Sequence, residues 1–111
     1  MQVQEYVQGA IRVLKPVGPL VRAEVGALKE AFARAARAAV SRLVVDASAV
    51  PFLDSLGIET LVDMTEQLAA GGHSLKLCGA NPTVRHVLEL TGWGDAFEFF
   101  DDVQAGVRSF L

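Results

Sequence analysis

The segment LVVDASAVPFLDSLGIET, residues 43–60, organises the rest of this chain. Its first three residues, LVV, are apolar and rich in β-branched side chains, which is typical of a strand buried on both faces. Turn-forming residues interrupt the run, Phe52 and Leu53 return to apolar character and are expected in the core, and a helical pattern begins at Leu56. The segment therefore predicts a strand, a turn and a helix, with polar residues at the rim of a sheet.

Polar residues stand on both sides of the predicted turn. Asp46 and Ser48 follow the strand and are predicted to close the turn through Asx-type hydrogen bonds. Asp54 and Ser55 precede the helix, and such residues accept hydrogen bonds from the free N–H groups of a first helical turn. Gly57 has no side chain, so we expect another surface to be able to approach the backbone beside Ser55. Capping preference alone would make Asp54-Ser55 an ordinary helix cap; the alternative is a serine hydroxyl displayed for function.

The composition is that of one globular domain, residues 1–111. An apolar share of 51% suffices for a core, and a charged share of 21% argues against a disordered chain. The net charge is −3 with acids and bases interspersed, so no nucleic-acid interface is predicted. Apolar runs are a few residues long, against about 20 needed to span a bilayer, so no membrane insertion is expected.

Two features concern the cellular compartment. The N-terminal sequence MQVQEYVQ has neither the basic start nor the apolar core of a signal peptide. The one cysteine, Cys78, cannot form an internal disulfide, which fits a reducing compartment. We therefore expect a cytoplasmic protein.

Strand and helix periodicities alternate along the chain after an opening hairpin. That order predicts an α/β fold with a mostly parallel sheet and right-handed crossovers. The predicted elements are strands at residues 3–7 and 10–17, a helix at 20–40, the strand at 43–45, a helix from 56 to a stop at 71–72, a strand at 74–79, a helix from 82 to a stop at 92, a strand at 97–100 and a final helix around 103–110.

Single residues set several of these boundaries. Pro16 and Pro19 are expected to end the second strand, because proline cannot donate to a β ladder. Asn81 is predicted to be an N-cap, with Pro82 in the first helical turn. Asp101, followed three residues later by a glutamine, resembles a capping box for the last helix.

The segment VVDASAVPFLDSLGI resembles the signature of the STAS family, the fold of bacterial anti-sigma-factor antagonists. That signature is a strand followed by D-x-S-x-V-x-x-[apolar]-D-S-x-G-[apolar]. Downstream, AAGGHSLKLCGANPTVRHVLELTGW is similar to the family's helix end, strand and N-P-x-V-R-x-x-L-x-L-T-G helix. The resemblance implies a mixed, mostly parallel sheet of four to five strands with an N-terminal hairpin, covered by about four helices. The residues that match the signature are Asp46, Ser48, Val50, Asp54, Ser55, Gly57 and Ile58.

The resemblance also implies a function. In antagonists of this kind the serine of D-S-x-G, here Ser55, accepts a phosphate. The unphosphorylated domain binds a switch kinase of the histidine-kinase-like ATPase type, which is also the anti-sigma factor, and so frees the sigma factor. Phosphorylation by that kinase ends the binding, and a phosphatase resets it. Asp46 and Ser48 would border the same interface.

The outer side of the helix after Ser55 offers a further contact surface. Leu56, Thr60, Met64 and Gln67 are spaced by three and four residues, away from the stripe assigned to the core. Leu56 and Met64 would then be exposed apolar groups that suit partner docking. Single exposed apolar residues are common, so this ridge could also have no function. The complete predicted partner-binding set is Asp46, Ser48, Asp54, Ser55, Leu56, Gly57, Thr60 and Met64.

No residue is predicted to be catalytic. A hydrolase nucleophile in an α/β fold sits in a G-x-S-x-G turn, and D-S-L-G around Ser55 lacks the first glycine. No glycine-rich phosphate loop is present. Cys78 has no cysteine or histidine at metal-ligand spacing, and His73 and His86 are expected to be solvated or packed. We expect neither a cofactor nor a metal.

Two other functions stay open on the sequence. The same fold could be a subunit of a larger assembly, such as a lipid-transport ATPase complex or a signalling scaffold, in which Ser55 contacts its partner constitutively. Co-purification with an ATPase subunit, unaffected by Ser55→Asp, would favour that function. An enzyme is the third possibility, which a broad hydrolase screen would test.

Overall fold

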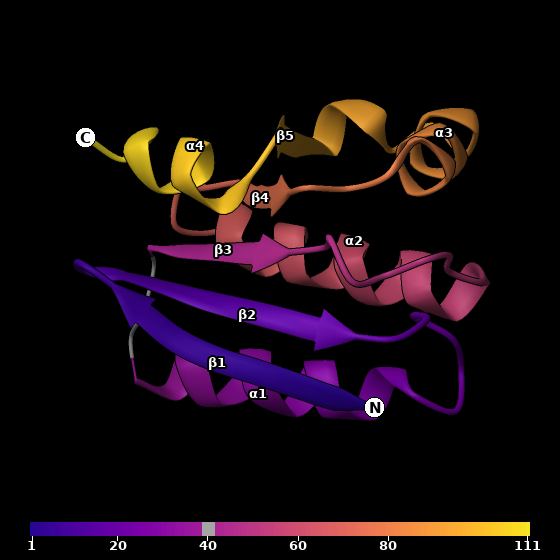
Figure 1. Ribbon diagram of the computed structural model, residues 1–111, viewed down its shortest axis with the longest axis horizontal. Coiled ribbons are helices and arrows are strands. Elements are labelled where there is room, and N and C mark those ends of the chain that lie inside the picture. Colours follow the sequence, from indigo (N-terminus) through magenta and orange to yellow (C-terminus); the bar gives the residue numbers. More distant parts are fainter. Residues whose placement is uncertain (39–41) are drawn as a thin grey trace.

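Five strands form one sheet in the order β1-β2-β3-β4-β5, so each strand lies beside its neighbour in sequence (Figure 1). The computed structural model describes residues 1–38 and 42–111. Among these residues, no helix combines the length and the apolarity needed to cross a membrane. The strands are β1 (Gln2–Gln8), β2 (Ile11–Val17), β3 (Leu43–Asp46), β4 (Leu75–Cys78) and β5 (Phe97–Phe100). The helices are α1 (Val25–Arg37), α2 (Ser55–Ala69), α3 (Pro82–Leu90) and α4 (Val103–Arg108), with a 3₁₀ turn η1 (Gly94–Ala96).

Only the first pair of strands is antiparallel. β1 and β2 form a hairpin that turns at Gly9, whose φ of 63° lies in the left-handed region that glycine tolerates. The pairs β2–β3, β3–β4 and β4–β5 are parallel, and each is connected through a helix. The predicted mostly parallel sheet with an N-terminal hairpin is therefore confirmed.

The second strand ends at Val17, as predicted. Pro16 lies inside the strand and pairs with Val3 of β1, so the expectation that Pro16 itself interrupts the ladder is wrong. β3 pairs only with residues 12–14 of β2. Pro16 thus lies beyond the stretch that β2 shares with both neighbours, where a missing N–H is tolerated.

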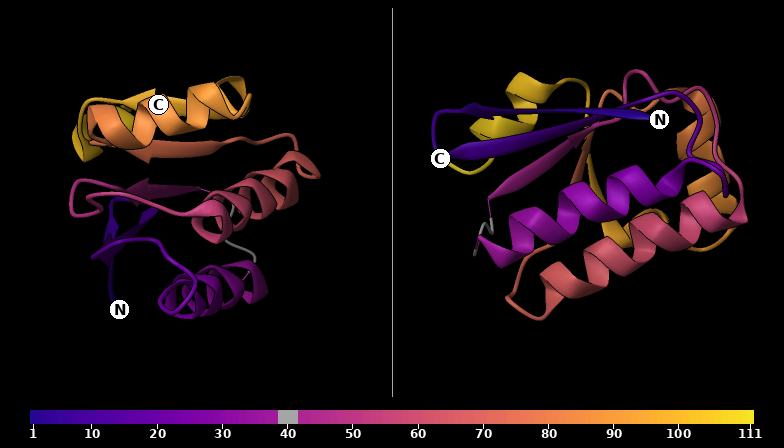
Figure 2. Two further views of the ribbon diagram at one scale, coloured as in Figure 1. Left: turned by 90° about the vertical axis from the view of Figure 1, so that its right-hand side faces the viewer. Right: turned by 90° about the horizontal axis from the view of Figure 1, so that it is seen from below.

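Helices cover both faces of the sheet (Figure 2). α1, α2 and α3 lie on one face, where Leu28, Leu61 and Leu88 belong to a single core cluster. α4 covers part of the other face. All four residues of β3 are buried, which confirms the prediction of a strand covered on both sides. The smaller cluster under α4 consists of Ile11, Val13, Val44 and Cys78, packed by Phe100, Val103, Val107 and Phe110.

The first helix starts later than predicted. A helix from residue 20 is expected from the periodicity, but α1 begins at Val25. Leu20 instead forms an isolated parallel bridge with Leu53: its N–H donates to the carbonyl of Phe52, and its carbonyl accepts from the N–H of Asp54. An N–H and a carbonyl that are bonded to another segment are not available for the hydrogen bonds of a helix. The predicted end of this helix at residue 40 lies outside the described residues.

The last two helices have side-chain caps at their N-termini. Asn81 caps α3 as predicted, because its Oδ1 accepts a 2.8 Å hydrogen bond from the N–H of Val84. α4 is capped by Asp102, which accepts a 2.8 Å bond from the N–H of Ala105, so the predicted cap at Asp101 is wrong by one residue. Asp102 has extended backbone, with a φ of −152°, directly before the first helical residue, as an N-cap requires.

Candidate functional site

Asp54 fixes the start of α2. It is the N-cap residue, and its Oδ1 accepts a 2.9 Å hydrogen bond from the N–H of Gly57. Its Oδ2 accepts a second bond of 2.9 Å from the N–H of Arg22, in the β2–α1 loop. The Gly57 and Arg22 N–H groups hold the pKa of the Asp54 carboxyl below its ordinary value, because they favour the charged form. Asp54 is therefore an ionised clamp between α2 and the β2–α1 loop.

The β2–α1 loop lies directly against the first turn of α2. A Cβ added to Gly57 would stand 2.1 Å from the carbonyl oxygen of Leu20, so only glycine permits this contact. Gly57 is buried as a result. Another surface does approach the Gly57 backbone closely, as expected, and that surface is the chain's own Leu20.

Ser55 is the first residue of α2, and its side chain is exposed. It lies at the positive end of a helix of 15 residues, where a negative charge is favoured. The helix starts beyond the carboxyl end of β3, on the right-hand side of the sheet in Figure 1. The exposure of Ser55 and its place at the rim of the sheet agree with the expectation from sequence. Its phosphorylation stays a prediction.

The turn after β3 is closed as predicted. The N–H of Ser48 donates a 3.0 Å hydrogen bond to Oδ1 of Asp46, which is the expected Asx-type bond. Asp46 is buried, with 8% of its surface exposed, whereas Ser48 is exposed. Ser48 is therefore open to solvent, whereas the Asp46 carboxylate is buried and holds the turn.

Only Gln67 of the predicted ridge on the outer side of α2 is exposed. Thr60 and Met64 are 1% and 2% exposed, and Leu56 is half-buried against the main core. The reason is that α1 lies beside α2 and covers the side of α2 that the predicted core stripe does not occupy (Figure 2). Thr60 and Met64 line a small hollow of about 230 Å³ between the two helices, opposite Lys29 and Phe32. The expectation that Leu56 and Met64 are exposed apolar groups is therefore wrong.

One exposed aromatic residue near Ser55 departs from the prediction. Phe52 and Leu53 are both expected in the core, but only Leu53 packs against it, and Phe52 is 51% exposed. The chain is extended here, because Leu53 bridges to Leu20, and neighbouring side chains of an extended chain point to opposite sides. That alternation, applied to Phe52-Leu53, is the sequence signal that places one of the two residues outside.

The loop that carries Phe52 is also tied to the start of α3. The Nδ2 of Asn81 donates hydrogen bonds of 3.3 and 3.1 Å to the carbonyls of Val50 and Pro51. Asn81 thus caps its own helix and fixes the neighbouring β3–α2 loop. The starts of α2 and α3 form one continuous rim at the carboxyl ends of the parallel strands.

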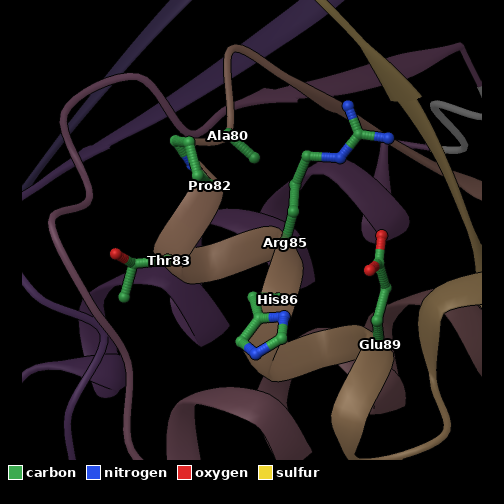
Figure 3. Close-up of a pocket in the computed structure, with 6 residues that line it drawn as sticks. All are labelled: Ala80, Pro82, Thr83, Arg85, His86 and Glu89. Carbon is green, nitrogen blue, oxygen red and sulfur yellow. The ribbon is translucent and has the colours of Figure 1, made fainter.

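An open hollow of about 610 Å³ lies against α3 (Figure 3). Thr83 extends from one side of the helix, and Arg85 and Glu89 extend from another. The Arg85 guanidinium lies 4.6 Å from the centre of the Phe99 ring, so it is engaged with the chain's own sheet. None of the predicted partner-binding residues lines this hollow, whose lining is Ala80, Pro82, Thr83, Arg85, His86 and Glu89.

Cys78 is a buried core residue, as predicted. Burial raises the pKa of its thiol to about 11, with a further contribution from the charge of Asp46, so the thiol stays protonated and weakly reactive. Within residues 1–38 and 42–111, no group of three or more His, Cys, Asp and Glu side chains is arranged to hold a metal ion.

A protein-family model matches almost the whole chain. The model describes the STAS domain, and the match covers residues 2–106. This chain belongs to the STAS domain family. The resemblance carried by VVDASAVPFLDSLGI is therefore confirmed, as is the predicted STAS-like sheet with its hairpin and four helices. Among curated protein sequences, none matches this chain.

Solved structures share this STAS fold. An anti-sigma factor antagonist from Mycobacterium paratuberculosis superimposes with a TM-score of 0.86 at 22% identity, over 97% of this chain and 92% of that one. The Bacillus cell fate determinant SpoIIAA in its phosphorylated form gives a TM-score of 0.73 at 22% identity, over 97% and 99%. A sulfate transporter family protein from Wolinella succinogenes gives 0.72 at 16% identity, over 94% and 87%. At these identities the likeness establishes the fold alone.

Proposed function

We propose that this STAS domain is an anti-sigma factor antagonist that binds a switch kinase while Ser55 is unmodified and leaves it when Ser55 carries a phosphate. The observation that carries the proposal is the exposed Ser55 side chain at the first residue of α2. The partner is a serine kinase of the histidine-kinase-like ATPase type that also acts as the anti-sigma factor, and a phosphatase resets the chain. An antagonist and a phosphorylated SpoIIAA among the structural neighbours support this function.

The reaction at Ser55 would be a phosphoryl transfer. Its Oγ attacks the γ-phosphorus of ATP bound to the kinase, the hydroxyl proton passes to a base of the kinase, and ADP leaves. Both carboxylate oxygens of Asp54 already accept backbone hydrogen bonds, at 2.9 Å each. Asp54 is therefore a positioning residue, which holds the helix turn under Ser55 and does not take the proton.

A phosphate on Ser55 would change the surface more than the fold. It adds about −1.5 to −2 charges, and the N-terminus of α2 favours a negative charge. A partner that closes over a neutral hydroxyl would instead have to desolvate this charge beside Asp54, and a buried uncompensated charge costs several kcal/mol. A loss of about 3 kcal/mol already weakens binding by roughly two orders of magnitude. Release then needs no refolding of the antagonist.

The position of the phosphate tests this proposal. Each histidine-kinase-like ATPase of the source genome is purified and incubated with the chain, ATP and Mg²⁺, and the modified residue is mapped by mass spectrometry. We expect phosphate on Ser55 and none on Thr83, an exposed hydroxyl in the first turn of α3 that serves as the internal control. No transfer to Ser55 by any of these kinases, together with a Ser55→Asp variant that binds as tightly as the unmodified chain, would contradict the proposal.

A second function is favoured by one comparison. A sulfate transporter family protein shares the fold, so the domain could be a constitutive subunit of a transport complex, such as a lipid-transport ATPase, or of a signalling scaffold. Ser55 would then contact its partner permanently. Co-purification with an ATPase subunit that is unaffected by Ser55→Asp would favour this function over the switch.

A further inference from the structure

Phe52 is a large apolar side chain that the fold leaves in solvent close to Ser55. Its side chain is 51% exposed, three residues before the serine. Three residues of chain span at most about 10 Å, so the two residues share one part of the surface. Among residues 1–38 and 42–111, the other large apolar residues that are exposed lie far from Ser55 in sequence: Tyr6, Val7, Val17, Leu90, Trp93 and Leu111.

The backbone on both sides holds Phe52 outward. The N–H of Leu20 donates a 3.1 Å hydrogen bond to the carbonyl of Phe52, and Asn81 donates a 3.1 Å bond to the carbonyl of Pro51. Leu53 packs against the main core, so the side chain before it points the other way. Phe52 cannot turn inward without breaking these contacts. A pre-ordered aromatic side chain with two χ angles loses little conformational entropy when a partner covers it.

A partner that covers Ser55 also covers Phe52. A specific interface buries about 800 Å² on each partner, which corresponds to a disc of roughly 16 Å radius. Phe52, within about 10 Å of Ser55 along the chain, lies inside such a disc centred on the serine. Aromatic side chains near the centre of an interface are the ones whose truncation weakens binding most.

We propose that Phe52 is the apolar anchor with which this chain binds its switch kinase, inserted into an apolar pocket that the kinase carries beside the site that receives Ser55. This inference rests on the proposed function for the identity of the partner, and it adds a residue and the chemistry of the partner surface. Two residues then have separate roles in kinase binding. Phe52 provides affinity, and the charge state of Ser55 determines whether the kinase can bind.

The test compares Phe52→Ala with Leu90→Ala. Leu90, on α3, is 72% exposed and serves as the matched control for the loss of an exposed apolar side chain. The probe is the purified histidine-kinase-like ATPase of the source genome that binds the unmodified chain most tightly, and binding is measured by titration calorimetry. We expect Phe52→Ala to raise Kd at least about 10-fold, and Leu90→Ala to leave it unchanged within about twofold. Phe52→Lys, a second variant with a charge in the same place, should bind more weakly still.

Thermal unfolding of both Phe52 variants should match that of the unmodified chain, because the side chain is half in solvent. An unchanged Kd in these variants, while phosphate on Ser55 still controls binding, would overturn the anchor and leave the proposed function intact. Weaker binding of Phe52→Ala without any phosphate on Ser55 would overturn the switch and leave the anchor. Self-association that Phe52→Ala abolishes at unchanged kinase affinity would assign Phe52 to a second copy of the chain and overturn the inference. If no such kinase binds the unmodified chain, both proposals fall.

Discussion

The helices that start after β3 and after β4 have similar caps but different surroundings. Asp54 and Asn81 each accept a hydrogen bond from the N–H three residues later, at 2.9 and 2.8 Å. In α2 that third residue is Gly57, packed against the carbonyl of Leu20. In α3 it is Val84, whose buried side chain belongs to the core. The same capping geometry thus places the third residue against the β2–α1 loop in α2 and in the core in α3.

The residue after the cap differs as well. α2 begins with Ser55, which is exposed, and α3 begins with Pro82, which has no hydroxyl. The charged cap of α2 holds the β2–α1 loop, whereas the neutral amide of Asn81 holds the β3–α2 loop. A capping motif alone is therefore no indication of a regulatory site. What distinguishes α2 is the place of its exposed hydroxyl: Ser55 is the first helical residue, on a turn packed against the β2–α1 loop, whereas the exposed hydroxyl of α3, Thr83, is the second residue of its helix.

Replacement of Gly57 gives the largest expected effect and tests whether the loop contact is essential to α2. Gly57→Ala places a Cβ 2.1 Å from the Leu20 carbonyl oxygen. Since the helix or the loop must move, we expect the free energy of unfolding to fall by about 3 kcal/mol or more. The control is Gly26→Ala in α1, where nothing lies within 4 Å of the added Cβ, and it should stabilise the chain by up to about 1 kcal/mol. Urea unfolding measures both, and equal effects would show that the contact is dispensable.

Removal of the second cap has a smaller expected effect. Asn81→Ala loses the N-cap bond of α3 and both bonds to the β3–α2 loop, and we expect a loss of about 1–2 kcal/mol of stability. Asn81→Asp keeps the cap acceptor and loses the donor, so it separates the two roles. Hydrogen exchange should show faster opening of the β3–α2 loop in both variants. Unaltered exchange there would mean that Asn81 does not hold that loop.

The smallest of the expected effects is the pH dependence of the stability that the Asp54 cap of α2 contributes. The N–H groups of Gly57 and Arg22 lower the pKa of Asp54 in the folded chain below its ordinary value of 3.8. The folded chain therefore binds this proton less readily than the unfolded chain does. The stabilising contribution of the carboxylate is present above the ordinary pKa and is lost as the pH falls through the lower folded value.

An NMR titration of the Asp54 carboxyl carbon should report that lowered pKa, and Asp54→Asn should flatten the stability curve below a pH of about 4. The neutral cap at Asn81 contributes no such dependence, so the pH range separates the two helix starts. A pKa of Asp54 at or above 3.8 would contradict the two hydrogen bonds assigned to it.

Features whose causes lie within a few residues are predictable from the sequence. The buried strand follows from its apolar run, the turn after it from Asp46, and the start of α3 from Asn81 and Pro82. The D-S-x-G signature locates the start of α2 and the exposed Ser55. These local preferences agree with the final fold, so tertiary contacts do not override them.

Features set by contacts between distant segments are not predictable in this way. Leu20 leaves the helical pattern because its backbone pairs with Phe52 and Asp54, more than 30 residues later. Met64 is buried because α1 lies beside α2, and the periodicity of one helix does not show which neighbour covers its second side. Gly57 likewise packs against Leu20, because the closest surface in space comes from the chain itself.

The most direct test of the switch is the affinity of one kinase for two forms of the chain, unmodified and phosphorylated on Ser55, together with the thermal unfolding of both forms. We predict that the phosphate raises Kd roughly 100-fold or more, while Tm changes by less than about 4 °C, which corresponds to less than about 1 kcal/mol. Equal Kd values for the two forms, or a loss of binding accompanied by a large fall in Tm, would contradict a switch that acts at the surface without refolding.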